Sequence, residues 1–533
     1  MSITIVSADS KKNQPSGAGL EITGQLIEYL LATTLVVLCI AVSLYAEDGY
    51  HKIGNVKYAV YRHIMVVGCA IIFAVMVPYA VFWVREHKKL RLSITDGCVL
   101  AYLLLSGVSV VSGGFYGDAL WGYDGWNMGI MSQISFILLY LLLSRFGRYY
   151  RLILTVLCAA ACVVYVIGIL HRLQIDPIGF YDGLTDYQKT QFLSTLGQAT
   201  WYGSFLAVTL PIGIGVFLYA GGKIWRILGG MMMALGFCTL VTQNSDSAYF
   251  ALAGALLIFF MISALDWETM CRYMGALTLF FASGKIMYFL MQIRPNPEFE
   301  ADLVTEMMWM SGVTWVLLVI CLSITIMLYV SGGRTNSRKY LTALIHRLRQ
   351  IVPVSVIAAV VGVIAVIILQ TGGVLPKAIS DRLAGVSYFN WHNEWGNGRG
   401  RIWSFSIRMF MEADVKLKLF GVGPDCFHSY VVNHYSDEQI LYWGKKQLTN
   451  AHNEWLTSLI NVGILGTAAY VGVYMTAVLR FCREHRRNIL LAGIAASCMS
   501  YMCYNFFCYQ QVLCTPFIFM LMGIGEYIFR ESG

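Results

Sequence analysis

The sequence predicts an all-α, polytopic integral membrane protein with about fourteen transmembrane helices. Of its 533 residues, 57% are hydrophobic and only 13% are charged, about half the charged fraction of an ordinary soluble domain. Apolar runs of about 20 residues recur along the chain, each long enough to cross the ~30 Å hydrocarbon layer as a helix. One long polar segment, residues 372–455, precedes the third-last run. We expect this segment to form a large extracytoplasmic loop domain.

Window hydropathy places the predicted spans at 26–46, 64–84, 94–112, 128–144, 152–170, 201–219, 227–243, 248–265, 273–293, 309–330, 351–371, 456–479, 489–508 and 512–529. The chain then divides into a cytoplasmic tail (1–25), a membrane domain of eleven spans (26–371), the polar segment (372–455), and three last spans with a short tail (456–533). The first 25 residues lack the basic start of a signal peptide, so we expect no cleaved leader.

The distribution of Lys and Arg predicts the orientation. One set of alternate connections carries 22 basic residues, and the opposite set, without the polar segment, carries six. Basic residues stay in the cytoplasm, so both termini are expected inside and residues 372–455 outside. The nine basic residues of that segment do not oppose this, because long loops cross largely regardless of charge. Most of the +8 net charge is therefore topological, and we expect no nucleic-acid partner.

The sequence AHNEWLTSLINVGILG (451–466) places a histidine where the polar segment enters a span. Asn450 or Asn453 is suited to cap the helix, with Glu454 in its first turn. A neutral imidazole at His452 is able to take a proton from a hydroxyl at physiological pH. The alternative is that His452 merely lies at the start of a helix and has no chemical role.

The sequence GRGRIW (398–403) holds Arg399, Arg401 and Trp403. Arginine keeps its charge and presents a fork that fits phosphate oxygens. Near a membrane surface, a lipid head group is the phosphate that we expect such a fork to bind. The alternative is that the two arginines are solvated and bind anionic lipid without specificity.

The sequence FGVGPDCF (420–427) is a tight turn in which Gly421 and Gly423 permit backbone angles barred to other residues. A single GxG is a weak sign of a phosphate cradle, and a structural turn is the favoured interpretation. The other histidines of the segment, His392, His428 and His434, match no standard zinc spacing. We therefore expect neither a metal nor a cofactor.

In this order, the three motifs resemble those of the O-antigen ligase/polymerase family (the Wzy_C superfamily), bacterial surface-polysaccharide polymerases or ligases. The matching residues are Arg399 with Trp403, Gly421 with Gly423, and His452 with Asn453 and Leu456. The segments 194–212 and 510–523 are also similar to family segments, although Gln198 and Thr200 replace two asparagines. One departure is Asp246, which stands where members often carry an arginine. Either another cation replaces it, with Lys285, Arg172 and Arg382 as candidates, or the donor is held differently, or activity is lost.

The resemblance implies a GT-C-like, multi-pass enzyme of the bacterial cytoplasmic membrane that works in cell-envelope, capsule or exopolysaccharide biosynthesis. It implies an inverting, metal-independent glycosyltransferase whose donor is an oligosaccharide on an undecaprenyl-type polyprenyl pyrophosphate. The acceptor would be a hydroxyl of a glycan, lipid or protein. His452 would act as general base and Arg399 and Arg401 would bind the pyrophosphate. Trp403, Gly421, Gly423, Asn453 and Glu454 would support them, and the aromatic loops at 115–126 and 389–395 would offer faces to sugars.

A transporter or flippase of lipid-linked glycans is the main alternative. Such a protein is expected to line a central cavity with charged residues inside its spans. Here Lys285 and Asp246 are nearly the only candidates, whereas the polar residues concentrate in 372–455. The sequence therefore favours the enzyme. The motifs do not separate a polymerase from a ligase.

Overall fold

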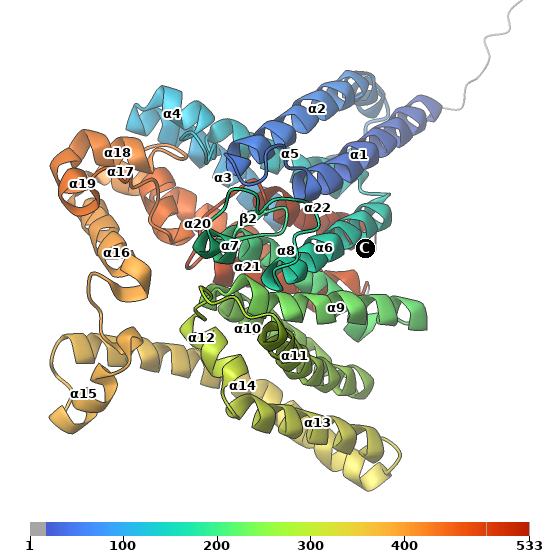
Figure 1. Ribbon diagram of the computed structural model, residues 1–533. Coiled ribbons are helices and arrows are strands. Elements are labelled where there is room, and N and C mark those ends of the chain that lie inside the picture. The colour runs from blue at the N-terminus through green and yellow to red at the C-terminus, as the bar shows by residue number, and fades with distance from the viewer. Residues whose placement is uncertain (1–16, 487, 532–533) are drawn as a thin grey trace, which may run out of the picture.

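The computed structural model describes residues 17–486 and 488–531, and within them the regular secondary structure is almost entirely helical (Figure 1). Each of the fourteen predicted spans falls on one helix: α1 (Ala18–Leu44), α2 (Ile53–Arg85), α3 (Ile94–Gly113), α5 (Ile130–Phe146), α6 (Tyr150–Arg172), α8 (Ala199–Tyr219), α9 (Lys223–Gln243), α10 (Asp246–Ser263), α11 (Trp267–Ile293), α13 (Val313–Ser331), α14 (Thr335–Thr371), α20 (Glu454–Arg483), α21 (Leu490–Tyr504) and α22 (Thr515–Glu531). The prediction of an all-α polytopic protein is confirmed. The expected tail over 1–25 lies mostly outside the described residues, and α1 already begins at Ala18.

The remaining elements are short: α4 (Tyr116–Trp121), α7 (Asp186–Gln191), β1 (Phe192–Leu193), β2 (Gly197–Gln198), α12 (Leu303–Thr305), the π-helix η1 (Glu306–Met310), α15 (Lys377–Ala384), the 3-10 helix η2 (Ser387–Phe389), α16 (Trp395–Glu412), α17 (Val415–Phe420), α18 (Phe427–His434) and α19 (Ser436–Trp443). Strands β1 and β2 pair antiparallel, with Phe192 opposite Gln198. The polar segment between α14 and α20 forms α15 to α19, which lie along one side of the helical bundle (Figure 1, orange).

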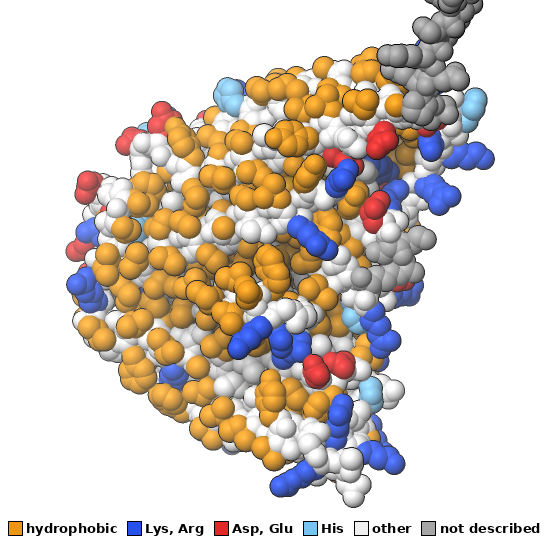
Figure 2. All heavy atoms as spheres, turned by 90° about the vertical axis from the view of Figure 1, so that its right-hand side faces the viewer, with side chains coloured by type: hydrophobic (Ala, Val, Ile, Leu, Met, Phe, Trp, Pro, Cys, Tyr) orange, Lys and Arg blue, Asp and Glu red, His pale blue; other side chains and the backbone are white. Residues whose placement is uncertain are grey.

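The outer surface has the character of a lipid-facing surface. Among the described residues, eleven helices are long and apolar enough to cross a membrane, and α5 and α21 are shorter apolar helices. In α14 the most apolar 18-residue window has 0% of its residues buried inside the protein. Figure 2 shows hydrophobic side chains over most of the face that it presents, with Lys and Arg mainly toward its right-hand border. Because such a surface is stable only in hydrocarbon, the chain is a multi-pass membrane protein.

Cations inside the spans are held by backbone carbonyls at the ends of other helices. Nζ of Lys57 donates to two carbonyl oxygens in the last turn of α1, at 2.9 and 3.3 Å. Nζ of Lys285 donates to two carbonyl oxygens where η1 ends, at 2.6 and 3.1 Å. Nε of Arg172 donates to the carbonyl of Thr242 near the end of α9, at 2.8 Å. Each cation thus satisfies carbonyls at a carboxyl-terminal helix end, where the partial charge is negative.

A network of ion pairs joins α3, α5, α20 and α22. Asp96 is fully buried and accepts two hydrogen bonds from Arg145, at 3.2 and 3.1 Å. Glu526, also fully buried, accepts two from Arg480, at 2.6 and 3.3 Å. Arg530 links the two carboxylates, at 2.5 Å from Asp96 and 3.2 Å from Glu526. The three arginines come from the connections that are predicted to be cytoplasmic.

Replacing Asp96 by alanine is expected to lower the free energy of unfolding by about 3 kcal/mol, because Arg145 and Arg530 lose a buried counter-charge. The unfolding temperature of the detergent-solubilised protein, followed by circular dichroism, measures this. Glu268→Ala is the control, since Glu268 pairs with Arg272 while its side chain is 76% exposed. That surface pair should contribute less than about 1 kcal/mol. Equal shifts in the two variants would contradict the stabilising role of the network.

Candidate active site

Arg399 stands directly after a left-handed turn at the start of α16. Gly396, Asn397 and Gly398 have φ angles of 58°, 61° and 86°, which glycine adopts freely and asparagine tolerates. After this turn, Nη1 of Arg399 donates to the Gly396 carbonyl (3.0 Å) and Nη2 to the Phe507 carbonyl (3.2 Å). Its Nε is buried and has no hydrogen-bond partner in the part of the chain that the structure describes. The guanidinium therefore keeps a donor for a ligand.

His452 lies in the loop immediately before α20. Asn453 caps this helix, because its Oδ1 accepts from the N–H groups of Trp455 (3.0 Å) and Leu456 (3.1 Å). His452 itself has φ 47°, in the left-handed region, and its N–H donates to Oδ1 of Asn450 (2.9 Å). The imidazole is half-buried, and its ring nitrogens form no hydrogen bond with any described residue. An unusual backbone conformation thus presents an unengaged imidazole.

The loop between α21 and α22 brings Arg399 and His452 together. Phe507 of this loop accepts the hydrogen bond from Arg399. Tyr509, two residues later, packs edge-on against the His452 imidazole, with ring centroids 5.4 Å apart. Burial, and next the positive charge of Arg399, lower the pKa of His452 to about 4. The imidazole is therefore neutral at physiological pH, the form that accepts a proton.

Arg401 points elsewhere. It lies two residues beyond Arg399, about 200° around the helix axis. Its Nη2 is 2.5 Å from Oε1 of Glu394, and its Nη1 donates to the Tyr442 carbonyl (3.4 Å) in α19. Of the two arginines expected to bind pyrophosphate, the structure brings only Arg399 to His452.

Trp403 is 8% exposed and belongs to an aromatic cluster. Its ring stacks on Phe507, with centroids 6.1 Å apart, and contacts Trp391 (6.0 Å) and Trp395 (5.5 Å). These contacts fix α16 against the loop between α21 and α22, and so fix the position of Arg399. The aromatic residues of 389–395, which we expected to face sugars, thus also pack on one another.

Gly421 and Gly423 clamp the polar segment onto α20. Gly463 interrupts α20 with φ 67°, and just before it the carbonyls of Ile460 and Asn461 accept from the N–H groups of Val422 (3.0 Å) and Gly423 (2.8 Å). A Cβ on Gly421, whose φ is 78°, would lie 2.4 Å from the Asn461 carbonyl oxygen. The amides of this turn are occupied by the helix, so the turn is structural and not a phosphate cradle.

Asp246 joins three segments near Arg399. Its Oδ1 accepts from the N–H of Val304 (3.0 Å), and its Oδ2 accepts from the hydroxyl of Tyr388 (2.8 Å). Burial and the charge of Asp246 raise the pKa of the neighbouring Asp302 to about 6, and the charge of Arg399 acts in the opposite direction. Arg399 is thus the cation whose charge acts on both Asp302 and His452.

The three cations considered as replacements for the family arginine have other roles. Arg172 and Lys285 bind helix-end carbonyls, as described above. Arg382 lies exposed on α15.

The other histidines of the polar segment serve local structure. Nδ1 of His392 accepts from the N–H of Glu394 (3.1 Å), and Nδ1 of His428 is 3.2 Å from the Leu448 carbonyl oxygen. His434 is exposed at the end of α18. Among the described residues, no group of three His, Cys, Asp or Glu side chains is placed to hold a metal ion.

Residues 303–471 match the family model described as O-antigen ligase. The matched segment contains Arg399, the Gly421–Gly423 turn and His452. This part of the chain is similar to the O-antigen ligase family, and the likeness supports membership of it. Members of that family act on lipid-linked oligosaccharides and glycan acceptors, so the likeness points to a glycosyltransferase-like membrane enzyme. No curated protein matches the chain.

Sequence reasoning missed the residues that join the two motifs of the site. Phe507 and Tyr509 lie in a connection that we predicted to be very short, between spans ending at 508 and beginning at 512. In the structure α21 ends at Tyr504 and α22 begins at Thr515. The run FFCY (506–509) is apolar and extends the hydropathy of the span, which hides the loop. The glutamines at 510 and 511 are the only local signal.

Proposed function

We propose that this chain is a member of the O-antigen ligase family and an inverting, metal-independent glycosyltransferase of the bacterial cytoplasmic membrane. It transfers oligosaccharide from a polyprenyl (undecaprenyl-type) pyrophosphate to an acceptor hydroxyl at the outer face, as polymerase or ligase. The observation that carries the proposal is the convergence of Arg399 and His452 on one loop. Displacement at an anomeric carbon needs a cation for the leaving group and a base for the nucleophile, and this pair supplies both.

In this mechanism, a ring nitrogen of His452 takes the proton of the acceptor hydroxyl as its oxygen attacks the anomeric carbon. The bond from that carbon to the pyrophosphate oxygen breaks on the opposite face, and its electron pair leaves with the pyrophosphate. Arg399 stabilises the charge that develops there. A single displacement of this kind inverts the anomeric configuration. We assign Arg401 a supporting role at the edge of the site, because its Nη2 pairs with Glu394 and its Nη1 donates to the Tyr442 carbonyl in α19.

The surrounding residues position these two groups. Asn453 fixes the start of α20, Trp403 fixes α16, and the Gly421–Gly423 turn clamps the polar segment to α20. The orientation that the basic residues predict puts both termini in the cytoplasm and this site outside. Both substrates would be tied to the membrane or held at its surface, which reduces the entropy lost in bringing them together.

The test is transfer by the purified full-length protein in lipid nanodiscs, with a synthetic polyprenyl-pyrophosphate oligosaccharide as donor and acceptor. Elongated glycan with inverted linkage and released polyprenyl pyrophosphate is expected, and EDTA should leave the rate unchanged. Retention of configuration, or loss of the activity in EDTA, would overturn the proposed mechanism.

A further inference from the structure

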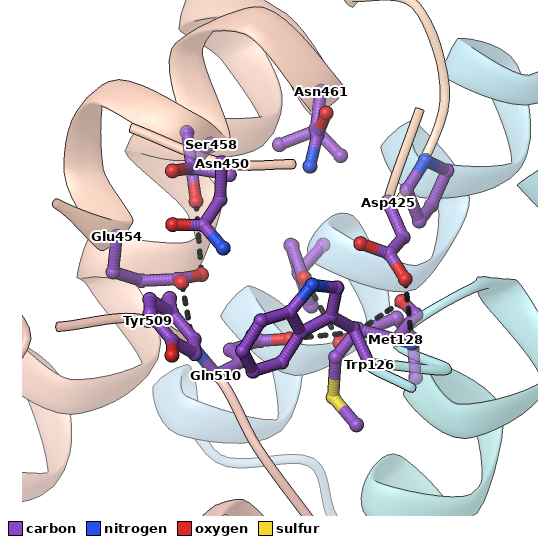
Figure 3. A pocket seen from close by; sticks show the side chains of 14 residues that line it. Trp126, Met128, Asp425, Asn450, Glu454, Ser458, Asn461, Tyr509 and Gln510 are labelled. Atoms are coloured by element: carbon purple, nitrogen blue, oxygen red, sulfur yellow. Dashed lines mark hydrogen bonds between the residues drawn. The ribbon is translucent and has the colours of Figure 1, made fainter. Parts of the chain in front are cut away.

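A small polar cavity, drawn in Figure 3, lies beside two residues that contact His452. Its volume is about 40 Å³, and it is lined by residues from α3, the loop at 126–128, α5, the Pro424–Asp425 turn, α20 and the loop between α21 and α22. At ~10–15 Å³ for each water, it has room for about three. Asn450 and Tyr509 both line it and both contact His452. The cavity therefore opens next to the proposed base.

Two polar groups in the cavity have hydrogen-bonding capacity that the protein leaves unused. Oδ2 of Asp425 accepts from the N–H groups of Tyr123 and Met128, both at 2.9 Å. Its other oxygen accepts from no described residue and points toward the middle of the cavity (Figure 3). Asn461 is 9% exposed, and its side-chain oxygen is buried without a partner among the described residues. Buried groups of this kind are rarely left unpaired unless water or a ligand satisfies them.

The opposite wall of the cavity is rigid. The hydroxyl of Tyr102 donates to Oε1 of Gln133 (3.0 Å), and Nε2 of Gln133 donates to Oε1 of Gln510 (2.7 Å). The backbone N–H of Gln510 donates in turn to Oε2 of Glu454 (2.9 Å), which is 5% exposed. This chain of hydrogen bonds holds the wall in one arrangement, so that a ligand finds its partners already oriented.

Two aromatic rings complete the site. Trp126 and Tyr509 meet at 77° with ring centroids 4.7 Å apart. Rings of this kind suit the C–H face of a sugar, whereas carboxylate and amide groups suit its hydroxyls. A phosphate would find no cationic side chain among the residues that line the cavity, and a metal ion would find only one free carboxylate oxygen. The chemistry therefore favours a neutral polyhydroxyl ligand.

We propose that this cavity binds hydroxyl groups of the acceptor sugar and so directs the attacking hydroxyl to His452. This inference rests on the proposed function. The volume admits one edge of a sugar, such as two neighbouring hydroxyls or a hydroxymethyl group, while the rest of the ring stays outside. The bound hydroxyls replace the waters and pair with the free oxygen of Asp425 and with the side-chain amide of Asn461.

The test is saturation-transfer difference NMR on the full-length protein in nanodiscs, without donor. The probes are methyl glycosides of glucose, galactose, mannose, rhamnose and N-acetylglucosamine. The wild-type protein should transfer saturation to at least one glycoside, and Asn461→Leu should weaken its binding ~5-fold or more, as expected for one lost hydrogen bond. Asn461→Ala, which leaves no bulky side chain, provides a second variant. Asn433→Leu is the matched control, because Asn433 is exposed on α18.

Binding that is equal in the wild type and in both Asn461 variants would overturn the inference, and so would an absence of binding by every glycoside. In those cases the cavity holds water only. The experiment needs no turnover, so it separates the two proposals. If binding depends on Asn461 but no donor is turned over, the proposed chemistry fails and the sugar site stands.

Discussion

Replacing His452 by alanine is expected to reduce the rate of glycan transfer by ~10²- to 10⁴-fold, the usual contribution of a general base. The imidazole is neutral, half-buried and free of hydrogen bonds to the described residues, so its removal takes away a proton acceptor and little structure. Initial rates in nanodiscs with a defined polyprenyl-pyrophosphate donor measure the loss. Expression and membrane insertion should not change.

The matched control is His434→Ala, in the same segment but exposed at the end of α18. It should turn over like the wild type. If His452→Ala keeps full activity, or if the two alanine variants lose activity equally, His452 is not the base.

The pH dependence of the wild-type enzyme tests the same assignment. Burial and the charge of Arg399 lower the pKa of His452 to about 4, so kcat/KM should be constant at neutral pH and fall as the pH drops through about 4. Bound pyrophosphate neutralises Arg399 and adds negative charge, and both effects raise the pKa of the imidazole. The acidic limb of kcat should therefore lie at higher pH than that of kcat/KM. An identical limb in both profiles would contradict the coupling between Arg399 and His452.

The membrane architecture followed from the sequence because a single physical requirement governs it. A span must be about 20 apolar residues long and must satisfy its own backbone, so hydropathy alone located all fourteen helices. Window hydropathy did not detect the loop between α21 and α22, for the same reason. The phenylalanines of this loop are as apolar as a span, yet both pack on Trp403 of the polar segment.

The site was predictable in its residues but not in its geometry. In the sequence, Arg399 and Arg401 are two positions apart. The side of α16 on which each side chain lies depends on where the regular part of this helix starts. The left-handed turn at 396–398 sets that start. Similarly, the Gly421–Gly423 turn fits a phosphate cradle or a structural clamp until the break at Gly463 supplies the carbonyls that occupy its amides.

The described cations also bear on the transporter alternative. A transport pathway needs charged side chains that face a cavity within the spans. Lys57, Lys285 and Arg172 instead donate to helix-end carbonyls, and Arg172 lies against Phe299 as well. Arg399, by contrast, keeps a buried Nε without a partner among the described residues, and its charge acts on His452, which is the arrangement that an enzyme requires.

Arg399→Lys and Arg401→Lys are expected to differ sharply, although the residues are two positions apart. Lysine keeps the charge but loses the fork, so Arg399→Lys should lower kcat/KM for the donor by ~10²-fold, as for the loss of one preorganised donor to a developing anion. Arg401→Lys should have a small effect, because the interaction with Glu394 lies outside the reacting groups. Each variant is assayed over a range of donor concentrations at a fixed acceptor concentration.

A third variant separates the charge of Arg399 from its geometry. Arg399→Gln removes the charge that helps to lower the pKa of His452, so this pKa should rise from about 4 toward its ordinary value of 6.5. In Arg399→Lys the charge remains and the pKa should stay low. The imidazole titration, followed by NMR in nanodiscs, reports this even where turnover is lost.

A larger loss of donor use in Arg401→Lys than in Arg399→Lys would move the proposed pyrophosphate site to the α19 side of α16. An unchanged pKa of His452 in Arg399→Gln would show that the two groups do not act on one substrate.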